Sequence, residues 1–239
     1  MQIGTVKQIW RYAVKSMAGE QLESCAVGTL GIPADRGWAI RDETTGEITT
    51  GSRLPLLMQC EARYCESPRN GSIPHVVMHF PNGVELASDV SDVNARLSEL
   101  LDRSVSLRSL QPASAPHITH FDAYPIHVLT TASLEAMKQL NTAAMWDVRR
   151  FRPNFLIQTN DGVKGLVEFD WSALRLGGVE LKCEMRTERC AMATNAQKEI
   201  PKDPSILRSL VEAADQNLGV YASVVAEGEV RVGDVVEVL

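Results

Sequence analysis

The sequence has 239 residues, of which 44% are hydrophobic and 23% are charged, the composition of an ordinary soluble globular protein. This composition excludes a disordered or fibrous chain. Its 24 basic and 30 acidic side chains leave a formal net charge of −6. That balance argues against nucleic-acid partners and against an anionic membrane surface, so any anion-binding site has to be local.

The first residues, MQIGTVKQIW, lack the apolar core of a signal peptide, and the chain contains no run of about 18 apolar residues. We therefore expect a cytoplasmic protein. The five cysteines are scattered and include no C-x-x-C pair, so the sequence predicts neither a disulfide framework nor a four-thiolate zinc site. Cys60 and Cys65 have the spacing that begins one iron–sulfur motif, but Pro68 occupies the next ligand position, which excludes that cluster.

Strand patterns dominate the chain, and many come in pairs joined by turn residues, which is typical of antiparallel hairpins. In chain order, hairpins are predicted at residues 38–48 across Thr45-Gly46, 76–86 across Asn82-Gly83, and 173–185 across Gly177-Gly178. In the last hairpin, apolar residues alternate with charged ones, which predicts a buried face formed by Val179, Leu181, Cys183 and Met185. The valine-rich segment 220–239 is predicted to form strands broken at Gly228 and Gly233.

Helices are few, and three are predicted from apolar residues at helical spacing. They cover residues 93–101 after a Ser91 cap, 134–140 after Thr131, and 206–214 after Asp203 as cap and Pro204 at the first helical position. Many strands with few short helices indicate a mainly β (α+β) fold in which antiparallel sheets close into barrels. A soft break at 111–116 separates two strand-rich blocks, so we expect domains at 1–115 and 116–239.

Three guanidinium groups occur within four residues at 149–152, just before the apolar strand 155–157. Guanidinium groups bind phosphate and carboxylate bidentately, so this cluster in an acidic chain indicates an anion site. The alternative is a solvated basic turn that pairs with surface carboxylates. Segments 12–19 and 35–38 leave a similar choice between a ligand-binding loop and a polar or salt-bridged turn.

Cys190 follows the third hairpin, and Arg186 and Arg189 precede it. Neighbouring cations favour the thiolate, the form that binds soft metals, whereas the alternative is a small buried hydrophobic residue. Cys183, which alternates onto the apolar face, is predicted to be a core residue. The sequence lacks H-E-x-x-H, G-x-S-x-G, Walker and G-x-G-x-x-G motifs, so zinc, hydrolase, triphosphatase and dinucleotide functions are not predicted.

Taken in order, six sets of residues resemble the molybdenum-cofactor sulfurase carboxyl-terminal (MOSC) family with its associated amino-terminal domain. The matching segments are Tyr12-x-x-Lys15-Ser16 with Gly19-Glu20, Gly31 with Asp35-Arg36-x-Trp38, Pro125-Ile126-His127 with Thr131-Ala132-Ser133-Leu134, Arg150-Phe151-Arg152-Pro153-Asn154, Arg189-Cys190, and Gly219-Val220-Tyr221 with Arg231-Val232-Gly233-Asp234. Together they cover essentially the whole chain. Where family members carry an acidic residue before a proline after the cysteine, this chain has Thr194-Asn195-Ala196-Gln197.

The resemblance implies an antiparallel β-barrel MOSC domain packed on a β-rich amino-terminal domain, with a molybdenum–pyranopterin cofactor between them and the metal bound by Cys190. The resemblance also implies that Lys15, Arg36 and Arg152 bind the cofactor phosphate, with Ser16 and Asn154 as neutral hydrogen-bond partners. Further cofactor-binding positions carried over from the matching segments are Thr131, Ser133, Arg189 and Tyr221. A thiolate suits molybdenum because it is soft and charged.

Family members similar to this chain reduce N-hydroxylated compounds, so the resemblance implies an oxidoreductase acting on a small N–O substrate. The ferredoxin-like and pyridoxal-phosphate domains of some relatives do not fit within this length. We therefore expect no iron–sulfur cluster, no pyridoxal phosphate, and a separate ferredoxin- or flavin-type electron donor. Two alternatives stay open: a carrier that delivers the cofactor or a Cys190 persulfide to other molybdoenzymes, and a metal-free β-barrel binding module.

Overall fold

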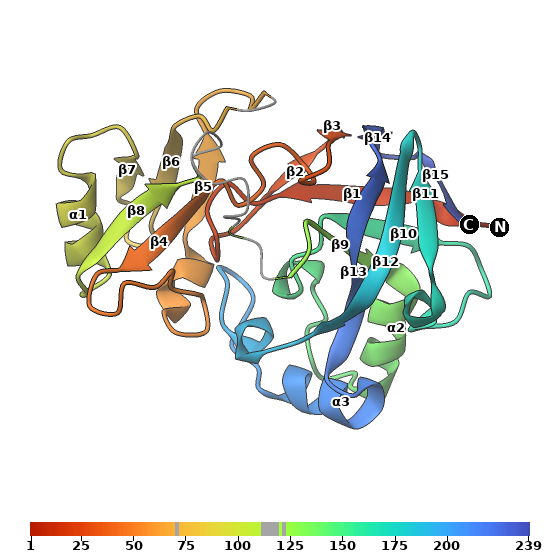
Figure 1. The fold of residues 1–239 in the computed structure, drawn as a ribbon. Coiled ribbons are helices and arrows are strands. Elements are labelled where there is room, and N and C mark those ends of the chain that lie inside the picture. The colour runs from red at the N-terminus through yellow and green to blue at the C-terminus, as the bar shows by residue number, and fades with distance from the viewer. Residues whose placement is uncertain (70–71, 111–119, 121–122) are drawn as a thin grey trace.

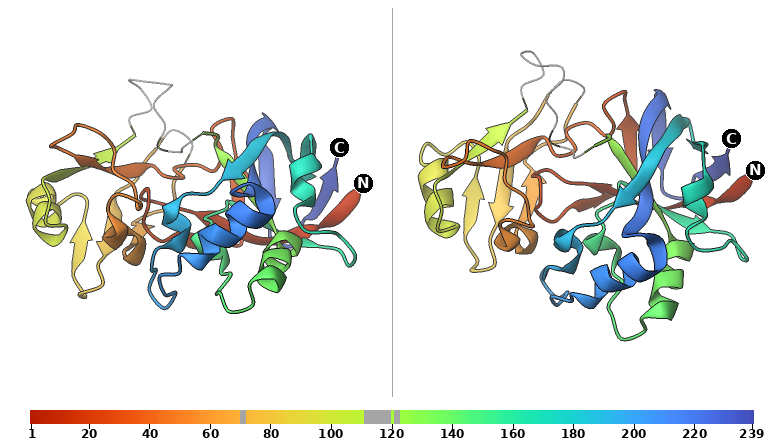
Figure 2. Two further views of the ribbon diagram at one scale, coloured as in Figure 1. Left: turned by 90° about the horizontal axis from the view of Figure 1, so that it is seen from below. Right: turned by 60° about the horizontal axis from the view of Figure 1, so that its bottom comes forward.

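The computed structural model describes residues 1–69, 72–110, 120 and 123–239. The predicted break at 111–116 lies outside these residues. Two units lie side by side in Figure 1: a barrel that carries both chain termini, and a smaller unit around β4 to β8. Both views in Figure 2 keep the same separation.

The barrel is a closed sheet of seven strands in the order β10, β9, β13, β12, β11, β15 and β1, with β1 pairing back to β10. Its strands are β1 (Gln2–Arg11), β9 (Ile126–Thr130), β10 (Phe155–Thr159), β11 (Ala173–Leu176), β12 (Val179–Glu188), β13 (Asn217–Ala226) and β15 (Val235–Val238). On its margins, β2 (Glu20–Leu22) pairs with β1, and β14 (Gly228–Arg231) pairs with β3 (Ser24–Val27). The predicted mainly β barrel is confirmed.

One pair of barrel strands departs from the antiparallel expectation, because β9 and β10 are parallel. A parallel pair needs a crossover connection, and α2 (Thr131–Leu140) lies in the chain between these two strands. Together with α3 (Ser205–Ala214), α2 packs against the outside of the barrel. Leu129, Leu156 and Leu210 belong to the apolar layer that joins the helices to the sheet.

The smaller unit has its own hydrophobic core, which includes Met17, Ile40, Leu57 and Leu97. Its strands form a pair, β4 (Trp38–Asp42) with β8 (Val105–Ser109), and a three-stranded sheet of β5 (Glu61–Tyr64), β6 (Val76–His79) and β7 (Glu85–Ala87). The helix α1 (Val93–Leu100) packs on β8. Short 3-10 helices occur at Pro55–Gln59, Val148–Arg150, Val167–Asp170 and Ala191–Thr194.

The amino-terminal strand belongs to the barrel and not to the smaller unit. Residues 2–11 form a barrel strand, and β3 pairs with β14, so the chain enters the smaller unit after the barrel has begun. The division at residues 115 and 116 stays a prediction.

The hairpin across Gly177-Gly178 is confirmed as β11 and β12, but its predicted face is wrong at one end. Val179 and Leu181 are buried and Cys183 is partly buried against the same core, whereas Met185 is 49% exposed. The pairing of β12 with β13 shifts register between Cys183 and Met185, and a shift of one residue turns the following side chains to the other face.

The other local predictions hold to different degrees. The hairpin across Asn82-Gly83 is confirmed as β6 and β7. The predicted hairpin at 38–48 forms in part: Ile48 bridges Arg41, and the N–H groups of Asp42 and Thr49 donate to the carbonyls of Glu47 and Ile40. In addition, β4 pairs along its length with β8.

The three predicted helices are present, with small changes at their starts. Asp92, rather than Ser91, precedes α1, and Thr130 caps α2 by accepting a hydrogen bond from the Ser133 N–H. Pro204 is the residue before α3, and the Asp203 carboxylate accepts a 2.9 Å hydrogen bond from the Ser205 N–H. Within the described residues, no helix is long and apolar enough to cross a membrane.

Candidate functional site

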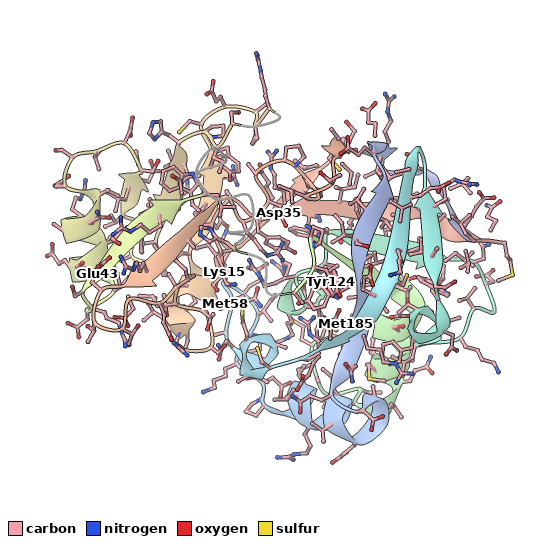
Figure 3. All side chains as sticks on the ribbon, viewed as in Figure 1. Lys15, Asp35, Glu43, Met58, Tyr124 and Met185 are labelled. Atoms are coloured by element: carbon pink, nitrogen blue, oxygen red, sulfur yellow. The ribbon has the colours of Figure 1, made fainter. Side chains whose placement is uncertain are left out.

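A cleft of about 210 Å³ lies between the barrel and the smaller unit. The smaller unit and the segment that leads into it contribute Lys15, Ser16, Arg36, Thr50 and Ser52; the barrel and its loops contribute His127, Arg150, Phe151, Arg152, Glu188, Arg189, Cys190, Met192, Ala193 and Tyr221. In Figure 3, Lys15 lies where the two units meet, whereas Glu43 lies at the far end of the smaller unit. Seven of the ten residues predicted for the site line this cleft.

Two predicted cations are held against one aromatic ring. Tyr12 follows β1 and is buried, and its hydroxyl donates a 3.0 Å hydrogen bond to the Pro153 carbonyl. The Arg36 and Arg152 guanidinium carbons lie 4.7 and 4.1 Å from the centre of the Tyr12 ring. Arg152 also donates a 2.6 Å hydrogen bond to the Met17 carbonyl. Cation–π contacts of this kind orient both guanidinium groups at the cleft.

Asp35 connects this arrangement to the backbone. Its carboxylate accepts hydrogen bonds from the Tyr12 N–H at 2.8 Å and from the Asn154 side-chain amide at 3.0 Å, and it pairs with Arg36. Asn154 in turn accepts a 3.1 Å hydrogen bond from the His127 N–H. Asn154 is buried and is not among the described residues that line the cleft, so the structure places it behind the site as a support.

Three of the predicted positions have a strained backbone. Ser16, Arg36 and Arg152 have φ angles of 70°, 53° and 54°, in the left-handed region that residues other than glycine rarely occupy. Each such conformation costs about 1–3 kcal/mol, and such residues cluster at ligand sites, where the surrounding structure fixes them. All three residues line the cleft.

Lys15 and Arg189 complete the basic lining. Lys15 Nζ donates a 2.7 Å hydrogen bond to the His120 carbonyl, and Arg189 donates a 2.8 Å hydrogen bond to the Phe151 carbonyl. Among the described residues that line the cleft, Glu188 is the one carboxylate. The protein as a whole is acidic, so the cleft is a local region of positive charge suited to an anionic ligand.

Cys190 is exposed and directly follows β12 and Arg189. Its Sγ lies 3.9 Å from Ser52 Oγ, a residue of the smaller unit. Arg186, which the sequence places near this thiol, instead has its guanidinium carbon 4.6 Å from the Phe169 ring centre. At Cys183, burial, and then the charge of Glu184, raise the pKa of the thiol to about 11.

His127 is a lining residue that the sequence analysis missed. Its ring lies 5.5 Å from the Tyr221 ring, and within the described residues its Nε2 has no hydrogen-bond partner. Burial, and then the charge of Arg189, lower its pKa well below the ordinary value, which keeps the side chain neutral. A Cβ at Gly219 would collide with this ring, so the glycine at φ 81° makes room for it. Its signal in the sequence was its place in the segment Pro125-Ile126-His127, and the structure pairs it with Tyr221 across β9 and β13.

The remaining arginines and hydroxyl residues have structural partners. Arg149 pairs with Asp147 and Glu199, as a basic turn would. The buried Arg150 donates to the carbonyls of Met145, Ala193 and Pro201. Thr131 and Ser133 begin α2 and are not among the described residues that line the cleft: Thr131 Oγ1 lies 3.2 Å from Thr159 Oγ1, and Ser133 donates a 2.7 Å hydrogen bond to Glu168.

The lining fits a cofactor that carries a phosphate group and a soft metal. The cations at Lys15, Arg36 and Arg152 suit the phosphate, and the exposed Cys190 sulfur suits the metal. The left-handed conformations of Arg36 and Arg152 show that the fold holds these side chains in place at a cost.

The chain matches the MOSC domain over residues 115–237 and the MOSC N-terminal beta barrel domain over residues 3–110. The first match spans more than half of the chain. The chain therefore belongs to the MOSC family, which confirms the resemblance drawn from the sequence.

Similar proteins include two with curated names. The mitochondrial amidoxime-reducing component 1 of Mus musculus is 26% identical, with 100% of this chain and 83% of the relative covered. The mitochondrial amidoxime reducing component 2 of Rattus norvegicus is 27% identical, with 98% and 82% covered. Although these relatives are named as mitochondrial, the cytoplasmic location of this chain stays a prediction.

Among solved structures, the YUAD protein from Bacillus subtilis superposes with a TM-score of 0.52 at 15% identity. The superposition covers 99% of this chain and 94% of that one. At this identity the likeness concerns the fold, which is thus shared over nearly the whole length of both proteins.

Proposed function

We propose that this MOSC protein is a molybdenum-cofactor-dependent oxidoreductase that reduces N-hydroxylated compounds with electrons from a separate donor protein. The observation that carries the proposal is the meeting, in one cleft between two units, of the exposed Cys190 with the cations Lys15, Arg36 and Arg152. Its relatives named as amidoxime-reducing components, matched over nearly the whole chain, support the substrate class.

The chain's own residues would hold the cofactor at both ends. Arg36 and Arg152 would bind its phosphate with oriented guanidinium groups, and Lys15 would add a third positive charge. Ser16 already accepts a hydrogen bond from the Gly51 N–H at 2.9 Å, so its hydroxyl hydrogen remains to be donated to the ligand. Cys190 would bind the metal through its sulfur.

When bound, the cofactor supplies the two-electron chemistry by which the N–O bond is cleaved. The balanced reaction takes an N–OH compound, two electrons and two protons to the N–H compound and water. The exposed side of Cys190 leaves space for a small substrate near the metal end of the cleft. His127 and Tyr221 line the same cleft from β9 and β13, and the neutral His127 adds no charge there that would repel a cationic substrate.

Electrons would come from a ferredoxin- or flavin-type protein that docks at the open side of the cleft. We propose no nucleic-acid or membrane partner, because the net charge of −6 and the small size of the basic cleft favour a small anionic ligand over an extended polyanion.

A carrier function is the second candidate, because an exposed thiol at a cofactor cleft also suits a persulfide that is passed to another protein. Turnover separates the two functions. A carrier would restore activity to a cofactor-free molybdoenzyme without reducing an N–O compound repeatedly.

The experiment uses the protein expressed in a host that makes the cofactor, with reduced viologen as electron source and a hydroxylamine or amidoxime as substrate. Wild type should contain up to about one molybdenum per chain and turn over many times, while Cys190→Ala should lose metal or activity. The matched control, Cys183→Ala, should keep both and lose roughly 1 kcal/mol of stability. Equal metal content and turnover in wild type and Cys190→Ala would show that Cys190 is not the ligand.

A further inference from the structure

A turn of the smaller unit reaches across the cleft to the sulfur of Cys190. The N–H groups of Arg53 and Leu54 both donate to the Thr50 carbonyl, at 3.0 and 2.9 Å, which closes the turn. Thr50 and Ser52 line the cleft, and their side-chain oxygens lie 3.2 Å apart. Ser52 Oγ is 3.9 Å from Cys190 Sγ.

The middle of this turn is anchored on two sides. The Gly51 N–H donates to Ser16 Oγ at 2.9 Å, and the Gly51 carbonyl accepts a 2.8 Å hydrogen bond from the Asn195 side-chain amide. Both hydrogen bonds are buried, where the loss of a partner is costly. Because Asn195 belongs to the loop after Cys190, the same contact ties the turn to the chain segment that carries the thiol.

Gly51 is closely packed, with no room for a side chain. A Cβ at this position would lie 2.6 Å from Met58 Sδ and 3.3 Å from Met192 Cγ. The two methionines come from different units, so packing and hydrogen bonding together fix where Ser52 stands relative to Cys190.

We propose that Ser52 donates a hydrogen bond to the Cys190 sulfur and so adjusts the electron donation of this thiolate to the metal. This inference rests on the proposed function. A thiolate can only accept hydrogen bonds, so the serine hydroxyl is the donor of the pair, and Thr50 Oγ1 helps to orient it. Hydrogen bonds to a ligating sulfur withdraw charge from it and tune the reduction potential of a metal site. Ser52 is thus a positioning residue, supplied by the unit that does not carry the ligand.

The test compares wild type with Ser52→Ala in the cofactor-loaded protein, by a redox titration followed through the molybdenum(V) electron paramagnetic resonance signal. Ser52→Ala should keep its molybdenum but show a lower midpoint potential, because the sulfur donates more strongly without the hydrogen bond. If the hydrogen bond favours one oxidation state over the other by about tenfold, the shift is about 59 mV for a one-electron couple.

Two further variants separate the hydrogen bond from packing. Ser52→Thr keeps the hydroxyl and should restore the wild-type potential. Asn195→Ala leaves Ser52 intact but releases the turn, and should lower the potential in the same direction as Ser52→Ala. Ser24→Ala, an exposed serine on β3 outside the cleft, serves as the matched control and should leave the potential unchanged.

An unchanged potential in Ser52→Ala, or an effect confined to the KM of the N–O substrate, would overturn the inference in favour of a substrate-binding serine. Those outcomes leave the proposed function standing, since wild type would still hold metal and turn over. A wild-type protein that holds no molybdenum in the competent host would overturn the proposed function and this inference together.

Discussion

Replacing each of two neighbouring arginines by lysine tests whether the cleft binds the phosphate of a cofactor. Arg152 is buried at the cleft, where it stacks on Tyr12 and donates to the Met17 carbonyl. Arg149 is a third exposed and forms ion pairs with Asp147 and Glu199. Both substitutions keep the charge, so a difference between them reports the guanidinium geometry.

The expected magnitude follows from what a lysine cannot do at position 152. A guanidinium has five donors in a planar fork, so it can bond Met17 and a phosphate together, whereas an ammonium is a single point of charge on a flexible stem. A charge-assisted hydrogen bond contributes about 1.5–3 kcal/mol. Its loss should weaken cofactor binding by roughly tenfold to 150-fold. At Arg149, the exposed pairs contribute about 1 kcal/mol or less, and to stability rather than to binding.

The assay is the molybdenum and pterin content of each purified variant after dialysis at a series of dilutions, with thermal unfolding as a check on the fold. Arg152→Lys should release cofactor at dilutions where wild type and Arg149→Lys retain it. Equal retention by the two lysine variants, at equal thermal stability, would refute the role given to Arg152.

Two further predictions concern the residues around this arginine. Burial lowers the pKa of His127, so its side chain stays neutral in the native protein. In the unfolded chain the same side chain takes up a proton below about pH 6.5. On acidification, the free energy of unfolding of wild type should therefore fall by up to about 1.4 kcal/mol per pH unit more than that of His127→Gln. Denaturant titrations of both proteins at pH 7 and 5.5 measure this difference. An equal fall in the two proteins would contradict a neutral buried histidine. Tyr12→Phe keeps the ring face for Arg36 and Arg152 and should retain cofactor, whereas Tyr12→Leu should lose roughly two- to thirtyfold in affinity, measured as molybdenum content; equal loss in both variants would point to the hydroxyl instead.

The sequence predicts the elements that are fixed by neighbouring residues. The hairpin across Gly177-Gly178 forms because a two-residue glycine turn sets the register on its own. The ladder between β4 and β8 could not be predicted in this way, because its partners lie more than sixty residues apart and form no local pattern. The side-chain alternation of β12 failed for a related reason, since the register shift beyond Cys183 arises from its pairing with β13.

The same distinction applies to the cleft. Lys15, Arg36, Arg152 and Cys190 carry charge or a reactive sulfur, so they stand out in a sequence and in the segments that resemble a family. Ser52 has no such signal, because an exposed serine in a turn is ordinary until the fold places it beside a thiol. For Asn154, the structure shows which hydrogen bonds its side chain already makes. Its amide nitrogen donates to the Trp10 carbonyl and to Asp35, and its amide oxygen accepts from the His127 N–H.

The path of the chain explains why the site needs both units. The chain leaves the barrel at the end of β1, and the next residues, 12–17, are those that supply Tyr12, Lys15 and Ser16. Long-range hydrogen bonds then close the cleft on either side of this crossing: Tyr12 to the Pro153 carbonyl, Arg152 to the Met17 carbonyl, and Asn195 to the Gly51 carbonyl. Each of these bonds joins the two units beside residues that line the cleft. A shift of one unit against the other would therefore separate the cations from the sulfur. The residues that hold the two units together thus also set the geometry of the site.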